Sequence, residues 1–171
     1  GSGGTLATVA GSVINFNGGA AQTIGTYTTY NDVEINNTSG GVTILGATTF
    51  GGTLTLTTGT FTVGAFALTV TGATSVSGTL AISSATGTKT FTGDVTINSG
   101  GVWDETAAAA VIFSGNFAND AATFTASTGT HTFNGAGKIL SGATATVIPT
   151  VTFATGAGPI NNGTLAVATL L

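Results

Sequence analysis

Few side chains in this sequence are of the types that do acid–base or metal chemistry. The 171 residues include one histidine, no cysteine and eight charged side chains, which are Asp32, Glu34, Lys89, Asp94, Asp104, Glu105, Asp120 and Lys138. The single His131 cannot build a histidine-rich metal site, and no serine-nucleophile motif accompanies it. We therefore expect a structural role for His131.

The adjacent acids Asp104 and Glu105, next to Trp103, are the best catalytic candidates. Paired carboxylates are the catalytic groups of glycosidases, so these residues would form a carbohydrate site if the two acids converged. Neighbouring residues of a strand point to opposite faces of a sheet, however. We therefore expect two solvated acids at a corner beside a surface tryptophan. The sequence predicts no catalytic residue and no enzyme activity.

Metal and cofactor sites are not indicated by any motif. Asp94, Asp104 and Asp120 would bind calcium only if folding aligned them. The Gly/Asp nonapeptide of calcium-binding β-rolls and the EF-hand loop are both absent. The glycine pair Gly40-Gly41 is not followed by the Lys-Ser or Lys-Thr of a phosphate-binding loop. The sequence therefore predicts no metal and no cofactor.

The scarcity of charge limits the partners that this chain can have. Charged residues make up 5% of the sequence, and the formal net charge is −4, whereas about a quarter of an ordinary soluble domain is charged. A surface with so little charge lacks the repulsion that keeps monomers apart, so self-assembly is expected. Two lysines cannot form the basic patch that nucleic acid or an anionic membrane requires. No apolar run approaches the roughly 18 residues of a membrane helix, so membrane insertion is not expected.

The elements that would position these side chains are short strands at a regular spacing. Apolar and small polar residues alternate in runs that end at corners rich in Gly, Ser, Thr or Asn, which is typical of strands with one buried face. Phe50 and Phe91 open matching runs 41 residues apart (91 − 50), and Phe91 and Phe113 open runs 22 apart (113 − 91). A repeat of about twenty residues is typical of stacked solenoid rungs.

The chain is therefore predicted to be all-β, a single β-solenoid (β-helix) domain over residues 1–171 with about seven to nine rungs. At about 4.8 Å per rung, the column would be on the order of 35–45 Å long. The alternative is a β-sandwich, whose strands also alternate. Residues 1–4 are expected to be a flexible lead, with a weak strand over 5–10. Residues 104–110 are expected to be an irregular excursion or a single helical turn.

The alternation also predicts which side chains line the core of the column. The expected buried residues are Val33, Ile35, Leu54, Leu56, Leu68, Val70, Leu80, Ile82, Phe91, Val95, Ile97, Phe113, Phe124, Phe133, Val151 and Phe153. A longer similarity is superimposed on the short repeat, because residues 133–137 resemble residues 16–20 at a spacing of 117 (133 − 16). This similarity predicts that the C-terminal third repeats the start of the N-terminal third, as in a longer repeat array or a polymer.

Pairs of threonines separated by one residue are frequent, for example in 53–57, 60–62 and 128–132. A flat ladder of such pairs is found on the binding faces of several β-solenoid ice-binding proteins. Threonine is also simply a good strand residue on either face, and the pairs do not share one phase in the sequence. The sequons at Asn36, Asn37 and Asn162 are candidate acceptors of N-linked sugar.

The repeat sequences resemble those of a known class of proteins. Residues 52–63, 88–98 and 124–133 are similar to repeats of large secreted bacterial surface proteins with β-helical stalks, such as filamentous-haemagglutinin-like adhesins and autotransporter passengers. The resemblance implies an extracellular or cell-surface location and a repetitive, non-enzymatic protein.

Together these features predict an extracellular structural protein, a β-solenoid subunit that stacks head to tail into a filament or surface fibre. Its expected partner is a further copy of itself, through the terminal rungs. The alternative is an adhesin stalk, or an ice-binding or glycan-binding module that uses exposed threonine ladders, with a surface glycan as a candidate partner.

Overall fold

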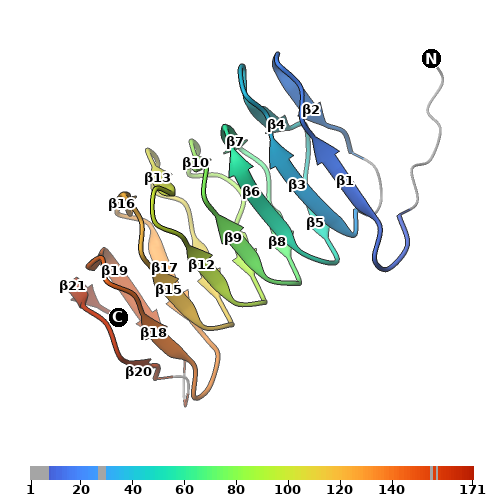
Figure 1. Ribbon diagram of the computed structural model, residues 1–171. Helices are drawn as coiled ribbons and strands as arrows, with labels where there is room; N and C mark the ends of the chain where they lie inside the picture. The colour runs from blue at the N-terminus through green and yellow to red at the C-terminus, as the bar shows by residue number, and fades with distance from the viewer. Residues whose placement is uncertain (1–7, 27–29, 155, 157) are drawn as a thin grey trace.

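The computed structural model describes residues 8–26, 30–154, 156 and 158–171, and every regular element within these ranges is a β-strand. The expected flexible lead, residues 1–4, lies outside the described residues, as do residues 5–7 of the expected first strand. Residues 8–10 are not in a strand. The strands stack into one elongated column in which the first and the last strand lie at opposite ends (Figure 1).

The strands form three parallel sheets, called here sheets I, II and III. Sheet I contains β1 (Val13–Phe16), β3 (Asp32–Asn36), β6 (Leu54–Thr58), β9 (Thr74–Val76), β12 (Val95–Ile97), β15 (Phe117–Asn119), β18 (Ile139–Ser141) and β20 (Ile160–Asn161). Sheet II contains β2 (Gln22–Ile24), β4 (Val42–Ile44), β7 (Thr60–Val63), β10 (Thr79–Ile82), β13 (Val102–Glu105) and β16 (Thr123–Thr125). Sheet III contains β5 (Thr48–Phe50), β8 (Leu68–Val70), β11 (Lys89–Phe91), β14 (Val111–Phe113), β17 (Thr130–Phe133), β19 (Thr146–Phe153) and β21 (Leu165–Leu170).

The chain passes through the three sheets in turn and makes about eight turns of a β-solenoid. Val33 of β3 pairs with Leu54 of β6, and Leu54 pairs with Thr74 of β9, so these turns contain 21 and 20 residues (54 − 33; 74 − 54). The predicted solenoid and its period are confirmed. A β-sandwich is excluded, because its sheets are antiparallel and every strand pairing here is parallel.

Side chains of the same register stack into columns inside the solenoid. In sheet III, Phe91 pairs with Phe113 and Phe113 with Phe133, and the ring centroids of these two pairs are 5.8 and 5.2 Å apart. Phe50 belongs to the same column. It pairs with Val70, and Val70 pairs with Phe91 in the following turn. The 41-residue spacing in the sequence is therefore two turns of the solenoid, and the 22-residue spacing is one.

Fourteen of the sixteen residues predicted to line the core are buried. The other two, Phe124 and Phe153, are half-buried and pack against the core. Phe124 lies in β16, the last strand of sheet II, and Phe153 lies in the penultimate turn. Both are therefore covered by fewer neighbours than residues in the middle of the column.

Three other expectations are corrected. Residues 104 and 105 belong to β13, so the irregular segment is only 106–110, and these residues do not form a helical turn. Trp103 is fully buried, and is not at the surface. The 117-residue similarity does not join equivalent positions, because Phe16 lies in sheet I and Phe133 in sheet III.

Glycines stack at the corner between sheets III and I, where successive turns approach closely. A Cβ atom added to Gly93 would meet the backbone of Gly72, and one added to Gly115 would meet the backbone of Gly93. The obstacle is main chain, which cannot rotate away as a long side chain can. The corner therefore excludes side chains on steric grounds.

Gly93→Ala is expected to lower the free energy of unfolding by about 1–3 kcal/mol, because the added methyl group overpacks this corner. Gly64→Ala is the matched control, since a Cβ atom there would meet nothing within 4 Å. Denaturant unfolding of both variants measures the difference. Equal stability of the two variants would contradict the close approach.

Candidate functional site

The predicted pair of acids does not converge. In β13, Asp104 points outward and is half-exposed, whereas Glu105 points inward and is 3% exposed. Trp103 also points inward, so it cannot offer a face to a sugar ring. The alternation of strand side chains separates the two carboxylates, as the sequence argument requires.

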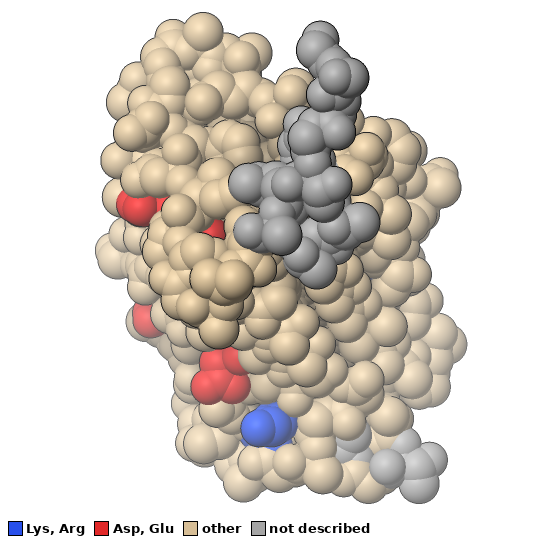
Figure 2. All heavy atoms as spheres, turned by 90° about the vertical axis from the view of Figure 1, so that its right-hand side faces the viewer, with Lys and Arg blue, Asp and Glu red and all other residues tan. Residues whose placement is uncertain are grey.

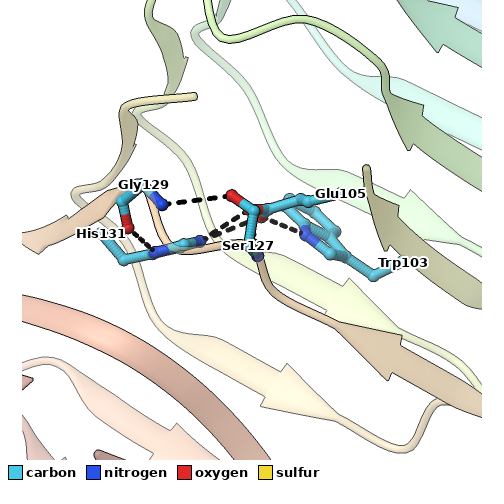
Figure 3. Close-up of polar contacts among 5 residues, drawn as sticks. All are labelled: Trp103, Glu105, Ser127, Gly129 and His131. Atoms are coloured by element: carbon cyan, nitrogen blue, oxygen red, sulfur yellow. Dashed lines mark hydrogen bonds and ion pairs between the residues drawn. The ribbon is translucent and has the colours of Figure 1, made fainter. Parts of the chain in front are cut away.

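Glu105 is instead the centre of a buried polar cluster (Figure 3). Its Oε1 accepts a hydrogen bond of 2.7 Å from Trp103 Nε1. Its Oε2 accepts hydrogen bonds of 3.0 Å from both the backbone N–H and the hydroxyl of Ser127, one turn further along. The carboxylate is thus held by neighbours from two turns of the solenoid.

His131 of β17 completes the cluster from sheet III. Its Nε2 lies 3.0 Å from both carboxylate oxygens of Glu105, and its Nδ1 lies 2.9 Å from the carbonyl oxygen of Gly129. Both side chains are fully buried. A carbonyl oxygen can only accept, so Nδ1 carries a hydrogen, and Nε2 is left for the contact with the Glu105 carboxyl group. Trp103 and Ser127 donate to the same carboxyl group, so His131 and Glu105 form a fully enclosed pair.

This arrangement is not a nucleophilic triad. Both nitrogens of His131 are engaged, and the Ser127 hydroxyl donates to Glu105 and makes no hydrogen bond to the histidine. A general base needs a free nitrogen within reach of the nucleophile. The described residues enclose no pocket that a substrate could enter, and they contain no group of three metal-ligating side chains. The geometry supports a structural cluster.

Lys89 is a buried cation that lies two turns before His131 in sheet III. It is fully buried in the register column that runs from Leu68 through Lys89 and Val111 to His131. Its Nζ donates hydrogen bonds of 3.1, 2.8 and 2.6 Å to the carbonyl oxygens of Gly64, Thr86 and Gly87. Burial lowers the pKa of Lys89, and the negative charge of Glu105 opposes this shift. Glu105 therefore acts on the Lys89 cation in the turn before it and pairs with His131 in the turn after it.

The lowered pKa of Lys89 has a consequence for stability in alkaline solution. Between the native pKa and the ordinary value of 10.5, the unfolded chain binds more protons than the native protein. Stability contributed by this group therefore rises with pH in that range. We expect the free energy of unfolding of the wild type to rise relative to that of Lys89→Met as the pH increases toward 10.5. A constant difference in denaturant titrations across this range would contradict the prediction.

The surface aspartates tie successive turns together. Asp32 accepts from the backbone N–H of Thr53 at 2.6 Å, Asp94 from that of Asn116 at 2.8 Å, and Asp120 from that of Ala143 at 2.7 Å. The hydrogen bond from the backbone N–H of Asn116, followed by that from its side-chain amide, lowers the pKa of Asp94. Acidic side chains appear as separate spots on the face shown in Figure 2, and not as one patch. Among the described residues, Asp94, Asp104 and Asp120 do not form a group that could hold a metal ion.

The outer face of sheet III carries a threonine ladder that was not recognised in the sequence. One register column contains five threonines and one isoleucine, which are Thr49, Thr69, Thr90, Ile112, Thr132 and Thr152. Their spacings are 20, 21, 22, 20 and 20 residues (69 − 49, 90 − 69, 112 − 90, 132 − 112, 152 − 132). Because the turn length varies, no single spacing in the sequence identifies these residues as one column. Only the strand register shows that they are aligned.

The sequons differ in accessibility. Asn37 is fully buried, and its Nδ2 donates hydrogen bonds of 2.8 and 2.9 Å to Ala20 O and Gln22 Oε1. Asn162 is exposed. Asn36 is half-exposed, so Asn36 and Asn162 are accessible to a modifying enzyme in the folded protein, whereas Asn37 is not.

Comparisons with known proteins give no relative. No family model matches the chain, and no curated protein and no solved structure matches it significantly. A search of the described residues for a helix long and apolar enough to cross a membrane finds none.

Proposed function

We propose that this chain is a structural β-solenoid whose end turns stack on further turns, head to tail, to build an extracellular filament or surface fibre. The observation that carries the proposal is the uncovered last turn. Leu165 and Val167 pair with Thr146 and Ile148, which are fully buried, yet both are partly exposed. Leu170 occupies the same column as the buried Val151 and is 65% exposed.

Within the described residues, the first turn is uncovered in the same way. Ile14 and Phe16 of β1 lie in register with the buried Val33 and Ile35, but they are only half-buried. The strands β1 and β2 each pair on one side alone. A further turn at either end would bury these apolar side chains and satisfy the free backbone edge. Because the two ends are different surfaces, their contact does not close on itself and leads to a fibre.

A charge placed at the uncovered C-terminal end tests the stacking. We expect the wild type to form fibres and Val167→Asp to remain short rods, because the carboxylate would be buried in the contact without a partner. Ala166→Asp is the matched control, since Ala166 lies on the same strand and faces outward beside the exposed Val147. Electron microscopy and sedimentation measure the outcome. A wild type that stays a monodisperse monomer at high concentration would overturn the proposal.

The threonine ladder of sheet III supports a second candidate function, binding of a regular planar ligand such as ice or a crystalline glycan. Neighbouring strands are about 4.8 Å apart, so the column presents methyl and hydroxyl groups at a constant spacing. We expect Thr90→Lys to abolish thermal hysteresis or glycan binding, and Thr62→Lys on sheet II to leave it intact. Absence of both activities in the wild type would remove this candidate.

A further inference from the structure

The two end turns share features that the middle of the column lacks. All eight charged side chains and His131 lie between residues 32 and 138, so residues 1–31 and 139–171 carry no charged side chain. Nine large apolar side chains are exposed in the described residues, and seven of them belong to the first turn or the last two. These seven are Val9, Val13, Ile139, Val147, Ile160, Leu170 and Leu171. Uncharged, apolar ends favour contact between the ends of two copies.

We propose that this contact has a fixed register, in which β20 of one copy pairs in parallel with β1 of the next, so that Ile160 lies beside Val13 and Asn161 beside Ile14. The inference rests on the proposed stacking and specifies its geometry. The partner is a second copy of this chain, oriented with its N-terminal end against the C-terminal end of the first.

The register follows from the outward column of sheet I. Within one copy, Val13 lies beside Asp32 at one end of this column, and Ile139 lies beside Ile160 at the other. Val13 is 58% exposed and Ile160 is 55% exposed. Placing Ile160 beside Val13 of the next copy continues the column and joins three apolar side chains across the boundary. A slip of one residue would instead turn the side chains of one strand to the opposite face.

The first half of β21 extends the same contact, because it follows β20 in the last turn as β2 follows β1 in the first. Leu165 and Val167 are the inward positions of the last turn, and Gln22 and Ile24 are the inward positions of the first. In the proposed register these two pairs of side chains meet. The sheet stacking then continues without a gap, and about eight turns at about 4.8 Å give an axial repeat of about 38 Å per copy.

The register can be tested with engineered disulfides, because the chain has no cysteine of its own that could form other disulfides. Adjacent strands bring Cα atoms to about 4.8 Å, within the range of about 4.4–6.8 Å that a disulfide accepts. Val13 and Ile160 lie at opposite ends of one copy (Figure 1), so they cannot join within it. We expect Val13→Cys combined with Ile160→Cys to give a ladder of covalent oligomers on mild oxidation. Both positions are exposed, so these substitutions leave the core unchanged.

The control pair is Asn15→Cys with Ile160→Cys, which is displaced by two residues along the strand. Diagonal neighbours are about 7–8 Å apart, beyond disulfide reach. A ladder for the first pair and none for the second supports the register. Wild-type fibres with no ladder for the first pair, or an equal ladder for both, would overturn the register while the proposed function stands. Absence of both fibres and ladder would overturn the stacking itself.

Discussion

Replacing Glu105 with leucine is expected to lower the free energy of unfolding by about 3–5 kcal/mol, because it removes one partner of the buried Glu105–His131 pair. His131 would lose its partner, and the Trp103 Nε1 hydrogen and the Ser127 donors would lose their acceptor. The charge of Glu105 also stabilises the buried Lys89 cation, so burial of that cation would become less favourable as well. Denaturant unfolding at neutral pH measures the change.

Asp104→Leu is the matched control for this experiment. Asp104 is the next residue in the same strand, but it faces outward and is half-exposed. Its replacement is expected to change stability by no more than about 0.5 kcal/mol. The double variant Glu105→Leu/His131→Leu should recover part of the loss, since removing both side chains leaves fewer buried polar groups without a partner. Equal costs for Glu105→Leu and Asp104→Leu would contradict the buried pair.

Trp103→Ala is expected to be about as destabilising, at about 3–5 kcal/mol, because it empties a large volume in the middle of the column. The indole is fully buried and lies within 5.4–6.4 Å, centroid to centroid, of the rings of Phe91, Phe113, Phe117 and Phe124. It also donates the shortest hydrogen bond that Glu105 accepts. The variant therefore loses core packing and part of the polar cluster together.

Phe66→Ala is the control for the loss of an aromatic ring, since Phe66 is 39% exposed. Its cost should be well below that of Trp103→Ala in the same thermal or denaturant unfolding. A small cost at Trp103 would mean that the surrounding rings collapse into the space, and would contradict a tightly packed aromatic centre. Both predictions concern side chains in the middle turns, whereas the proposed stacking involves the end turns.

Local features of the sequence were sufficient for the fold. Alternation of apolar and small polar residues determines which side of a strand is buried, and Phe50, Phe91 and Phe113 reveal the length of a turn because stacked turns place equivalent residues in one column. The corner at residues 36–41 was also predictable, since Gly40 and Gly41 have φ values of 84° and 71° that favour glycine.

The polar cluster was only partly accessible to the same reasoning. Glu105 has the inward phase of Trp103, and His131 has that of Phe133, so alternation alone could have identified both as buried. It could not have paired them, because they lie 26 residues apart on different sheets and in different turns. Expecting Trp103 at the surface was wrong for a related reason. A corner was assumed where the strand continues to Glu105.

The sequence by itself determined the class of fold, the turn length and most of the core, because these depend on periodicities within a single strand or between consecutive turns. Only the tertiary structure decided which side chains meet. The threonine column of sheet III, the Glu105–His131 pair and the uncovered ends all depend on the register between turns of unequal length. Register is set by backbone hydrogen bonds between strands of successive turns. Because the corners differ in length, residues in register are not separated by one fixed number of residues, and the sequence alone does not reveal them.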